Sequence, residues 1–339
     1  MQPRSTCILY EVIILDKLLE IKDLWVRYET GRSTAYALNG VNLSIDKGEA
    51  LGLVGESGAG KTTTALATLN LIPQPAGKIT KGDIIFDGKS VLKMKKKELM
   101  NMRGDKIAMI FQNPLTSLNP VFTVGEQIAM VLYKHKDMNK KQAQAEAGKL
   151  LEVVGIPAYR ISDFPHQFSG GMRQRVGIAA ALACNPALLI ADEPTTALDV
   201  TIQAQILELM KELLVKFSSS LLMITHNLGI IAEICQKVAV MYAGTIVEYG
   251  TVEEVFSSPA HRYTVGLFGS IPKLTGPREE LAFIPGTVAN PANLPGGCTF
   301  HTRCGYCMER CKTERPLMRA INANHYVACN HAIEVSANG

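Results

Sequence analysis

Short apolar segments alternate with helical patterns along the first three quarters of the chain. Residues 19–28 and 41–45 alternate apolar and polar positions, which predicts strands with one exposed face. The other apolar runs are continuous and predict buried strands, at residues 50–54, 84–86, 107–111, 187–191, 221–225 and 237–242. Because helical patterns lie between most of these runs, the sequence predicts an α/β fold with a mostly parallel sheet covered on both faces.

The pattern changes twice along the chain. A long helical pattern interrupts the strands and predicts a helical subdomain at about residues 113–185. After residue 256 prolines become frequent, and five of the eight cysteines follow. We therefore expect an N-terminal extension (1–17), a main domain (18–256) that contains the helical subdomain, and a small Cys-rich C-terminal module (257–339).

Composition argues against several classes of protein. The formal net charge of +4 gives no reason to expect a nucleic-acid partner. The apolar stretch at residues 7–15 is too short to cross a hydrocarbon layer of about 30 Å, is interrupted by Glu11 and lacks a small-residue cleavage site. No other segment qualifies as a membrane span, so we expect a cytoplasmic chain, and any function at a membrane would require partner subunits.

Residues 55–62 read GESGAGKT and match the G-x-x-x-x-G-K-[ST] phosphate loop. The glycines let backbone N–H groups turn toward phosphates, Lys61 reaches the β- and γ-phosphates, and the Thr62 hydroxyl coordinates Mg²⁺. A plain glycine turn is the alternative, but the strand before the loop and the helix after it favour nucleotide binding. The nucleotide-binding residues predicted here are Gly55, Ser57, Gly58, Gly60, Lys61, Thr62 and Thr63.

A later apolar strand ends in two acidic residues, Asp192 and Glu193. In a phosphate-loop protein a carboxylate at the end of a strand holds Mg²⁺, and this role suits Asp192. Glu193 is then placed to polarise the attacking water. The alternative is a strand whose acids only face solvent. Together with the phosphate loop, the pair of acids predicts hydrolysis of a nucleoside triphosphate.

Residues 168–174 read FSGGMRQ and indicate which kind of NTPase this is. The segment resembles the LSGGQ signature of ATP-binding-cassette (ABC) ATPases, with a phenylalanine in place of the leucine and a methionine in place of the glutamine. Taken alone, it could be a helix N-cap followed by a basic helix. The resemblance implies that Ser169, Gly170 and Gly171 face the ATP bound by a second ATPase subunit, either a paralogue or a second copy of this chain.

Four further positions match the same family in the expected order. The resemblance implies that Gln112 senses Mg²⁺ and the attacking water, that Asp199 belongs to a loop contacting the second subunit, and that His226 contacts the γ-phosphate. Tyr28 matches the aromatic residue that stacks on adenine, with Tyr36 as an alternative. The predicted catalytic residues are Lys61, Gln112, Glu193 and His226, and the predicted Mg²⁺ ligands are Thr62, Gln112 and Asp192.

Three segments resemble the dipeptide/oligopeptide (peptide/nickel) importer branch of this family. They are residues 111–120 (FQNPLTSLNP), 169–175 (SGGMRQR) and 259–264 (PAHRYT), the last with Arg262 in place of a proline. The resemblance, which covers the chain from about residue 18, implies a RecA-like P-loop NTPase core with an antiparallel β subdomain, the helical subdomain and a Cys-rich C-terminal module.

The same resemblance implies the partners of the chain. They are transmembrane permease subunits and a second ATPase subunit that together with this one encloses ATP, with an extracytoplasmic peptide-binding protein as an indirect partner. The chain would then lie on the inner face of the cell membrane. Dipeptides, oligopeptides, nickel chelates and other small solutes all remain open as cargo, because this subunit does not read the substrate.

The cysteines of the C-terminal module form a candidate metal site. Metal binding can supply folding free energy to a segment with many prolines and few apolar residues. Four thiolates suit zinc or an iron–sulfur cluster, and free or disulfide-linked cysteines are a further alternative. The resemblance implies a [4Fe–4S] cluster held by Cys298, Cys304, Cys311 and Cys329, with Cys307 as an extra thiol and His301, His325 and His331 as alternative ligands.

Two other classes of protein fit the sequence less well. Soluble cassette ATPases of DNA repair carry long coiled-coil insertions, and those of translation usually carry two cassettes; this sequence has neither pattern. A redox protein built around the cluster would need a further electron-carrier or flavin motif, and the sequence contains none that we identify. ATP-driven transport is therefore the function that the sequence favours.

Overall fold

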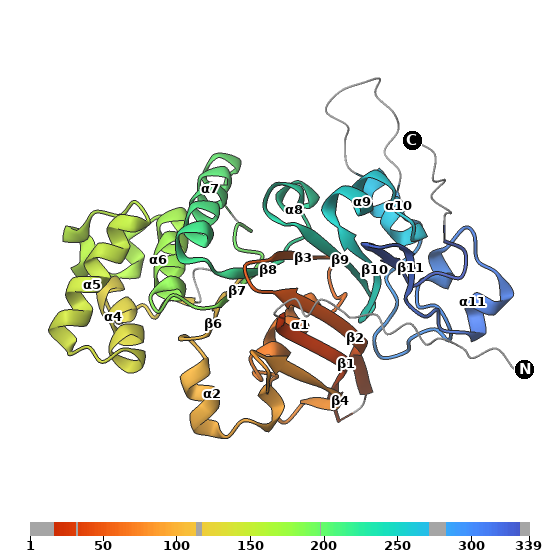
Figure 1. Cartoon of the computed structure of the whole chain (residues 1–339), viewed down its shortest axis with the longest axis horizontal. Helices are drawn as coiled ribbons and strands as arrows, with labels where there is room; N and C mark the ends of the chain where they lie inside the picture. The colour runs from red at the N-terminus through yellow and green to blue at the C-terminus, as the bar shows by residue number, and fades with distance from the viewer. Residues whose placement is uncertain (1–16, 32, 113–116, 197, 271–282, 333–339) are drawn as a thin grey trace, which may run out of the picture.

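The computed structural model describes residues 17–31, 33–112, 117–196, 198–270 and 283–332, and its strands form two sheets (Figure 1). Nearly all of the predicted N-terminal extension lies outside the described residues, as do the first residues of the predicted helical subdomain. Within the described part, none of the helices is long and apolar enough to cross a membrane.

The larger sheet has eight strands in the order β11-β12-β10-β9-β3-β8-β7-β6. Its parallel strands are β9 (Lys237–Tyr242), β3 (Ala50–Val54), β8 (Ser220–Ile224), β7 (Leu188–Asp192) and β6 (Ile107–Ile110). At one edge the antiparallel strands β10 (Thr245–Thr251), β12 (His325–Val327) and β11 (Arg319–Asn322) are added. This mixed sheet with a parallel centre confirms the predicted α/β fold.

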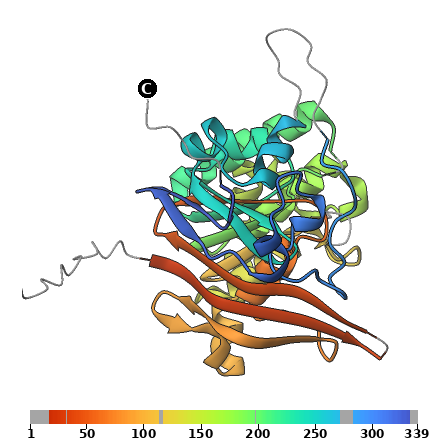
Figure 2. The ribbon, with the colours of Figure 1, turned by 90° about the vertical axis from the view of Figure 1, so that its right-hand side faces the viewer.

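The smaller sheet is antiparallel, in the order β2-β1-β4-β5. Its strands are β1 (Lys17–Thr30), β2 (Ser33–Asp46), β4 (Gly77–Phe86) and β5 (Lys89–Ser90). Figure 2 shows β1 and β2 as one long hairpin beside the larger sheet. In β1, Leu19 and Ile21 are buried whereas Lys22 is exposed, as expected for a strand with one solvent-facing side.

The strands of the larger sheet are buried on both faces. In β7, Leu188 and Ile190 join the apolar cluster shared with the antiparallel sheet, whereas Leu189 and Ala191 join the cluster shared with most of the helices. Successive side chains of a strand point to opposite faces, so a strand between two apolar layers must be apolar throughout. This requirement explains the continuous apolar runs in the sequence.

Helices cover both faces of the larger sheet. One face carries α1 (Lys61–Thr68) and the nearby α2 (Lys96–Met102), while α6 to α10 pack on the other. The remaining bounds are α4 (Val124–His135), α5 (Lys140–Val153), α6 (Gly170–Leu182), α7 (Val200–Phe217), α8 (Leu228–Ile234), α9 (Val252–Ser257), α10 (Arg262–Gly269) and α11 (Glu309–Thr313). Short 3₁₀ turns occur at η1 (Val91–Lys93), η2 (Ala158–Ser162), η3 (Pro165–Gln167) and η4 (His301–Arg303).

A group of helices extends from one end of the larger sheet, beyond β6 (Figure 1). It consists of α4, α5 and the adjoining part of α6, which pack on one another. Two of these helices start with a capping box, Thr123 with Glu126 for α4 and Asn139 with Gln142 for α5. The helical pattern in the sequence therefore corresponds to a compact helical unit, although its exact boundaries stay a prediction.

The C-terminal region, defined here as residues 257–270 and 283–332, joins the larger sheet through β12. The carboxylate of Glu248 on β10 anchors it and is itself fully buried. This carboxylate accepts hydrogen bonds from the backbone N–H groups of Ala260 (2.7 Å) and His261 (2.8 Å). His325 Nε2 on β12 lies 2.7 Å from Glu248 Oε1. One buried acid thus ties the start of α10 and strand β12 to the core.

Candidate nucleotide-binding site

The phosphate loop connects β3 to α1, and its backbone requires glycine at several positions. Gly55 (φ 155°) and Gly60 (φ 107°) have conformations that residues with a Cβ rarely adopt. A Cβ on Gly55 would lie 2.2 Å from Met241 O, and one on Gly60 would lie 2.7 Å from Ala37 O. Gly58 also has a positive φ, of 79°, and lies with Ser57 at the exposed tip of the loop. The strand–loop–helix context is the one that nucleotide binding requires.

Lys61 begins α1 and folds its ammonium group back over the loop. Its Nζ donates to Gly55 O (2.6 Å) and to Glu56 O (3.1 Å). Burial lowers the pKa of Lys61, and the charges of Glu193 and Asp192 oppose this effect. A largely buried cation held over a glycine-rich loop by two carbonyl oxygens is well placed to meet phosphate oxygens. Thr62 and Thr63 follow on the first turn of the helix, with Thr62 exposed and Thr63 half-buried.

Asp192 and Thr62, two of the predicted Mg²⁺ ligands, lie together. Asp192 ends β7 and is 3% exposed. Burial raises the pKa of Asp192, a hydrogen bond with Thr62 partly offsets that rise, and the neighbouring charge of Glu193 adds to it. A buried carboxylate beside a second carboxylate and a hydroxyl is a donor set that suits a hard divalent cation. The residues present therefore fit Mg²⁺.

The carboxylate of Glu193 contacts two other predicted catalytic residues, each of which follows the end of a different strand. Gln112 Nε2 donates to Glu193 Oε2 (2.8 Å), and His226 Nδ1 lies 3.3 Å from Glu193 Oε1. The Thr196 hydroxyl also donates to Oε2 (3.0 Å). Burial alone would raise the pKa of Glu193, but the hydrogen bonds from Thr196 and His226 and nearby positive charge outweigh it, so this pKa lies below its ordinary value. The carboxylate is therefore ionised at neutral pH.

Thr196 is a contact that the sequence analysis did not assign. It lies three residues after Glu193, in a turn closed by a backbone hydrogen bond from Thr196 N to Glu193 O. The available signal was its place at the start of the loop that leads to Asp199. A hydroxyl at this spacing can reach back to the carboxylate only because the chain turns there, which the sequence alone did not predict.

The signature residues lie at the start of α6, in the helical unit. Ser169 is the N-cap, and its hydroxyl accepts from Met172 N (3.4 Å). Gly171 faces α7 closely, because a Cβ there would lie 2.5 Å from Ile202 Cγ2. Asp199 caps α7 in the same way, accepting from Ile202 N (2.9 Å). The structure thus brings the signature and Asp199 together, and among the described residues no hydrogen bond joins this pair to the phosphate loop.

Both candidate adenine-stacking tyrosines lie on the β1–β2 hairpin. Tyr28 is half-buried and pairs with Ala35 and Gly77, and a Cβ on Gly77 would lie 2.9 Å from the Tyr28 ring. Tyr36 is 43% exposed and donates its backbone N–H to Pro291 O (2.8 Å). Contact with adenine by Tyr28 stays a prediction.

The four cysteines chosen as cluster ligands lie near one another in the C-terminal region. Burial raises the pKa of Cys298 to about 11, and nearby Cys329, Cys311 and Cys304 add to that rise. The chain is tightly folded here, with Cys298 N donating to Cys311 O (2.8 Å). Within the described residues, however, no group of three or more His, Cys, Asp or Glu side chains could hold a metal ion. The iron–sulfur cluster therefore stays a prediction.

The alternative ligands have other partners. His325 is buried and held by Glu248, as described above. His301 Nδ1 lies 2.9 Å from Cys298 O, and His331 stacks on Tyr306 with ring centroids 5.8 Å apart. The Cys307 thiol donates to Met308 O (3.6 Å). Each of these alternative ligands is therefore engaged in a contact of its own.

Comparison with known proteins identifies the family. Residues 38–196 match the family described as "ABC transporter", and residues 247–311 match "Oligopeptide/dipeptide transporter, C-terminal region". The oligopeptide transport ATP-binding protein OppD of Bacillus subtilis (strain 168) is 52% identical over 319 residues, covering 93% of this chain and 89% of its own length. The chain belongs to the ABC transporter family. It is an ATPase, with ATP as substrate and Mg²⁺ as cofactor.

Other relatives within the ABC transporter family have similar names and coverage. The dipeptide transport ATP-binding protein DppD of Bacillus subtilis (strain 168) is 46% identical and covers 93% of this chain and 95% of its own length. OppD of Salmonella typhimurium (strain LT2) is 47% identical and covers 94% of each. Among solved structures, the dimeric post-hydrolysis state of the cassette MJ0796 with ADP and Pi has a TM-score of 0.62 and 28% identity, covering 69% of this chain and 98% of that one.

Proposed function

We propose that this chain hydrolyses ATP to energise the import of peptides through a membrane ABC transporter, from the inner face of the membrane. The observation that carries the proposal is that one chain contains two functional parts. The first is the cassette in which Gln112, Glu193 and His226 meet, and the second is the match of residues 247–311 to oligopeptide/dipeptide transporters. Relatives named as oligopeptide and dipeptide transport proteins support peptides as the cargo.

In this mechanism, Glu193 orients and polarises the attacking water and accepts its proton, since it is ionised and held at three contacts. Gln112 and His226 fix the position of the carboxylate. Lys61 stabilises the charge that develops on the transferred phosphoryl group. Thr62, Gln112 and Asp192 would hold Mg²⁺, which supplies further charge stabilisation when it is bound.

The signature residues would act in a dimer. The solved cassette MJ0796 is described as dimeric, which supports a similar assembly for this chain. At the start of α6, Gly170 and Gly171 present backbone N–H groups without side-chain bulk, and a helix N-terminus favours an anion. Ser169, Gly170, Gly171 and Asp199 would then complete the site of the second ATPase subunit, and the phosphate loop of that subunit would meet the signature of this one.

We propose that a permease subunit docks in an apolar groove of about 290 Å³. It lies between the sheet and the helical unit and is lined by Leu71, Phe111, Leu118 and Val131, among others. The Phe111 side chain is 44% exposed in this groove, and the next residue along the chain is Gln112. We assign this groove to a short helix of a permease subunit. Movement of that helix would be transmitted through residue 111 to Gln112 and so to Glu193.

The test of the proposed function begins with the complex from native membranes. Affinity capture through a tag on this chain, followed by mass spectrometry, should recover permease subunits, a second ATPase subunit and an extracytoplasmic peptide-binding protein. Reconstituted in vesicles, the complex should take up peptides in an ATP-dependent manner, and Glu193→Gln should abolish uptake. Uptake of a nickel chelate but not of peptides would mean that the cargo is a nickel chelate and that peptides are not transported. Recovery of repair or ribosomal proteins without any permease would overturn the proposal.

For the C-terminal region we propose a [4Fe–4S] cluster held by Cys298, Cys304, Cys311 and Cys329, with zinc as the less favoured metal. The observations that support it are the mutual proximity of these thiols and their burial, which raises the pKa of Cys298, Cys304 and Cys329. Buried thiols become thiolates most readily when a metal supplies the balancing charge. The cluster would contribute ligation and folding free energy to a segment with little apolar core.

Protein purified without oxygen should be brown, with broad absorption near ~400 nm, iron and acid-labile sulfide. Cys304→Ser should remove the colour and make residues 283–332 sensitive to protease. Cys307→Ser is the matched control and should retain the colour, because it changes a neighbouring thiol outside the proposed set. Colourless protein with one equivalent of zinc would establish the zinc alternative. Loss of the cluster in the Cys307 variant but not in a Cys298 variant would mean a different ligand set.

A further inference from the structure

A residue of the phosphate loop, Glu56, is held by the C-terminal region. Its carboxylate Oε2 accepts a hydrogen bond from Arg303 Nη1 (2.8 Å) although the two residues are 247 positions apart in sequence. Its backbone N–H donates to the hydroxyl of Tyr263 on α10 (2.9 Å). Tyr263 belongs to the PAHRYT segment, to which the sequence analysis assigned no chemical role. Two groups of the C-terminal region therefore contact the first turn of the loop directly.

The Arg303 side chain is held in one orientation, because it is buried and each of its donor groups has an acceptor. Its side chain is 6% exposed. Besides Glu56, it donates from Nε to Pro285 O (2.9 Å) and from Nη2 to Ile284 O (3.2 Å). A planar guanidinium with three separate acceptors has little freedom to rotate, so it fixes the group that it holds.

Tyr263 is equally constrained. It is fully buried and packs against Tyr242 and Phe300, with ring centroids 4.8 Å and 5.5 Å away. Phe300 precedes the turn that carries Arg303, and it also packs on Tyr242 of β9 (5.2 Å). The aromatic cluster of these three rings therefore joins the core strand, α10 and the C-terminal region behind the phosphate loop.

Glu56 passes this constraint to the groups that bind phosphate. Its carbonyl oxygen accepts from Lys61 Nζ (3.1 Å) and from Ala59 N (3.1 Å). Fixing the side chain and the N–H of Glu56 therefore fixes the carbonyl that holds the lysine. A glycine-rich loop has few side-chain contacts of its own, so an external anchor reduces the number of conformations that nucleotide binding must exclude.

We propose that Arg303, together with Tyr263, is a positioning residue for the phosphate loop, so that seating of the C-terminal region on the core sets the affinity for ATP. The inference concerns the ATPase reaction and does not depend on the identity of the cargo or on the presence of a cluster.

Four variants test the link through nucleotide affinity. Arg303→Gln and Glu56→Gln should each raise the Kd for ATP by about tenfold, which is the effect expected for loss of one charge-assisted hydrogen bond. KM should rise in parallel while kcat changes by less than about twofold, because the hydrolytic residues are untouched. The double variant should be no weaker than either single variant. Arg303→Lys, which keeps the charge but not the planar arrangement of three donors, should recover only part of the affinity.

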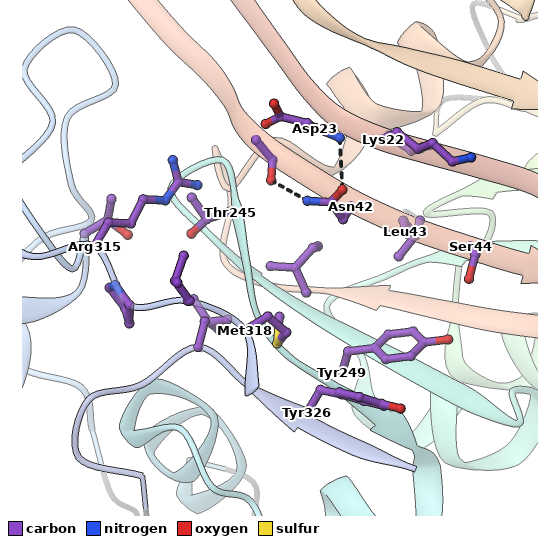
Figure 3. A pocket seen from close by; sticks show the side chains of 18 of the residues that line it. Lys22, Asp23, Asn42, Leu43, Ser44, Thr245, Tyr249, Arg315, Met318 and Tyr326 are labelled. Carbon is purple, nitrogen blue, oxygen red and sulfur yellow. Dashed lines mark hydrogen bonds between the residues drawn. The ribbon is translucent and has the colours of Figure 1, made fainter. Parts of the chain in front are cut away.

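The matched control is Arg315→Gln, at another junction between the C-terminal region and the core. Arg315 donates to Asn39 O and lies over the Trp25 ring, beside a cavity of about 670 Å³ that Asn42 and Ser44 also line (Figure 3). This variant should lower the thermal midpoint of the nucleotide-free protein without changing the Kd for ATP. An equal rise in Kd would mean that any loosening of the C-terminal region weakens binding, and the specific role of Arg303 would be wrong.

Tyr263→Phe keeps the aromatic packing and removes only the hydroxyl that accepts from Glu56 N. It should raise the Kd for ATP by a few-fold with little change in thermal midpoint. Because this variant and Glu56→Gln both leave Arg303 in place, they test the proposal even where Arg303→Gln is poorly folded. Unchanged affinity in both would overturn it.

Discussion

Glu193 shows how one residue can carry strain for function. Its φ of 47° lies in the left-handed region, which a residue with a long side chain adopts only at a local energetic cost. The conformation lets Glu193 N donate to Ile224 O (2.8 Å) while the carboxylate reaches Gln112 and His226. The two acidic residues at the end of β7 therefore have different surroundings, since Asp192 remains buried beside Thr62.

Replacement of Glu193 by glutamine should separate binding from hydrolysis. The amide keeps the shape but cannot accept a proton, so kcat should fall by at least about 100-fold while ATP still binds. With hydrolysis blocked, a nucleotide-bound dimer should accumulate and be visible by light scattering or gel filtration with ATP. Glu212→Gln, on the exposed side of α7, serves as the control and should behave like the unchanged protein. Wild-type turnover in the Glu193 variant would contradict the assignment.

At the scale of elements, α10 depends on a buried histidine. His261 is its N-cap, and Nδ1 accepts from Tyr263 N (3.0 Å). Burial lowers the pKa of His261 to about 4, with the charge of Glu248 opposing the shift. Nε2 is also buried, without a partner among the described polar atoms. Protonation at Nδ1 would remove the acceptor and bury a charge, so the folded state favours the neutral ring.

The sign of the resulting pH dependence follows from this lowered pKa. The unfolded histidine takes up a proton near pH 6.5, whereas the folded one resists until about pH 4, so unfolding free energy is lost as pH falls through that window. The loss should reach roughly 2 kcal/mol at pH 5. In His261→Asn, the amide oxygen can still cap α10 but does not titrate, so urea unfolding at pH 7.5 and pH 5 should differ less. Exposed His166→Asn should leave the pH dependence unchanged, and an equal effect there would refute the role of His261.

Elements with a strong local pattern were the ones that the sequence predicted. The buried strand at residues 187–191 and the loop at 55–62 coincide with β7 and the phosphate loop, because apolar runs and glycine spacing are local properties. Strands β11 and β12 were not predicted. They are short and lie in a proline-rich segment, and β12 is held by the distant residue Glu248. Pairing across such a distance leaves no periodic signal in the sequence.

The site follows the same rule. The sequence placed Gln112, Glu193 and His226 at three strand ends, and the parallel sheet order brings these ends to one edge. The hydrogen bond from Thr196 and the anchoring of Glu56 by Arg303 depend on side-chain packing between separate elements. Such contacts depend on the tertiary structure, so the spacing of residues in the sequence does not predict them.

At the scale of the whole molecule, the two halves of the proposed ATP site, the phosphate loop and the signature segment, lie in different parts of the chain. The phosphate loop follows β3, whereas the signature lies at the start of α6, in the helical unit (Figure 1). Under the proposed function, a single chain would bind ATP at its phosphate loop, and Ser169 would serve the ATP of a partner. In the proposed dimer, this division would make closure depend on nucleotide, which is the property that a transporter needs to convert hydrolysis into movement.

Substitution of Ser169 by arginine tests this division. The larger side chain at the α6 N-cap places bulk where a γ-phosphate of the partner would approach, so ATP-driven dimerisation and transport should be lost. The Kd of the isolated monomer for ATP should stay within about twofold of the unchanged protein, because its own phosphate loop is intact. Lys61→Ala is the comparison, since loss of the buried ammonium should remove ATP binding by the monomer itself. If monomer binding fell as far in the Ser169 variant as in the Lys61 variant, the signature would act within its own chain, and the dimeric mechanism would be wrong.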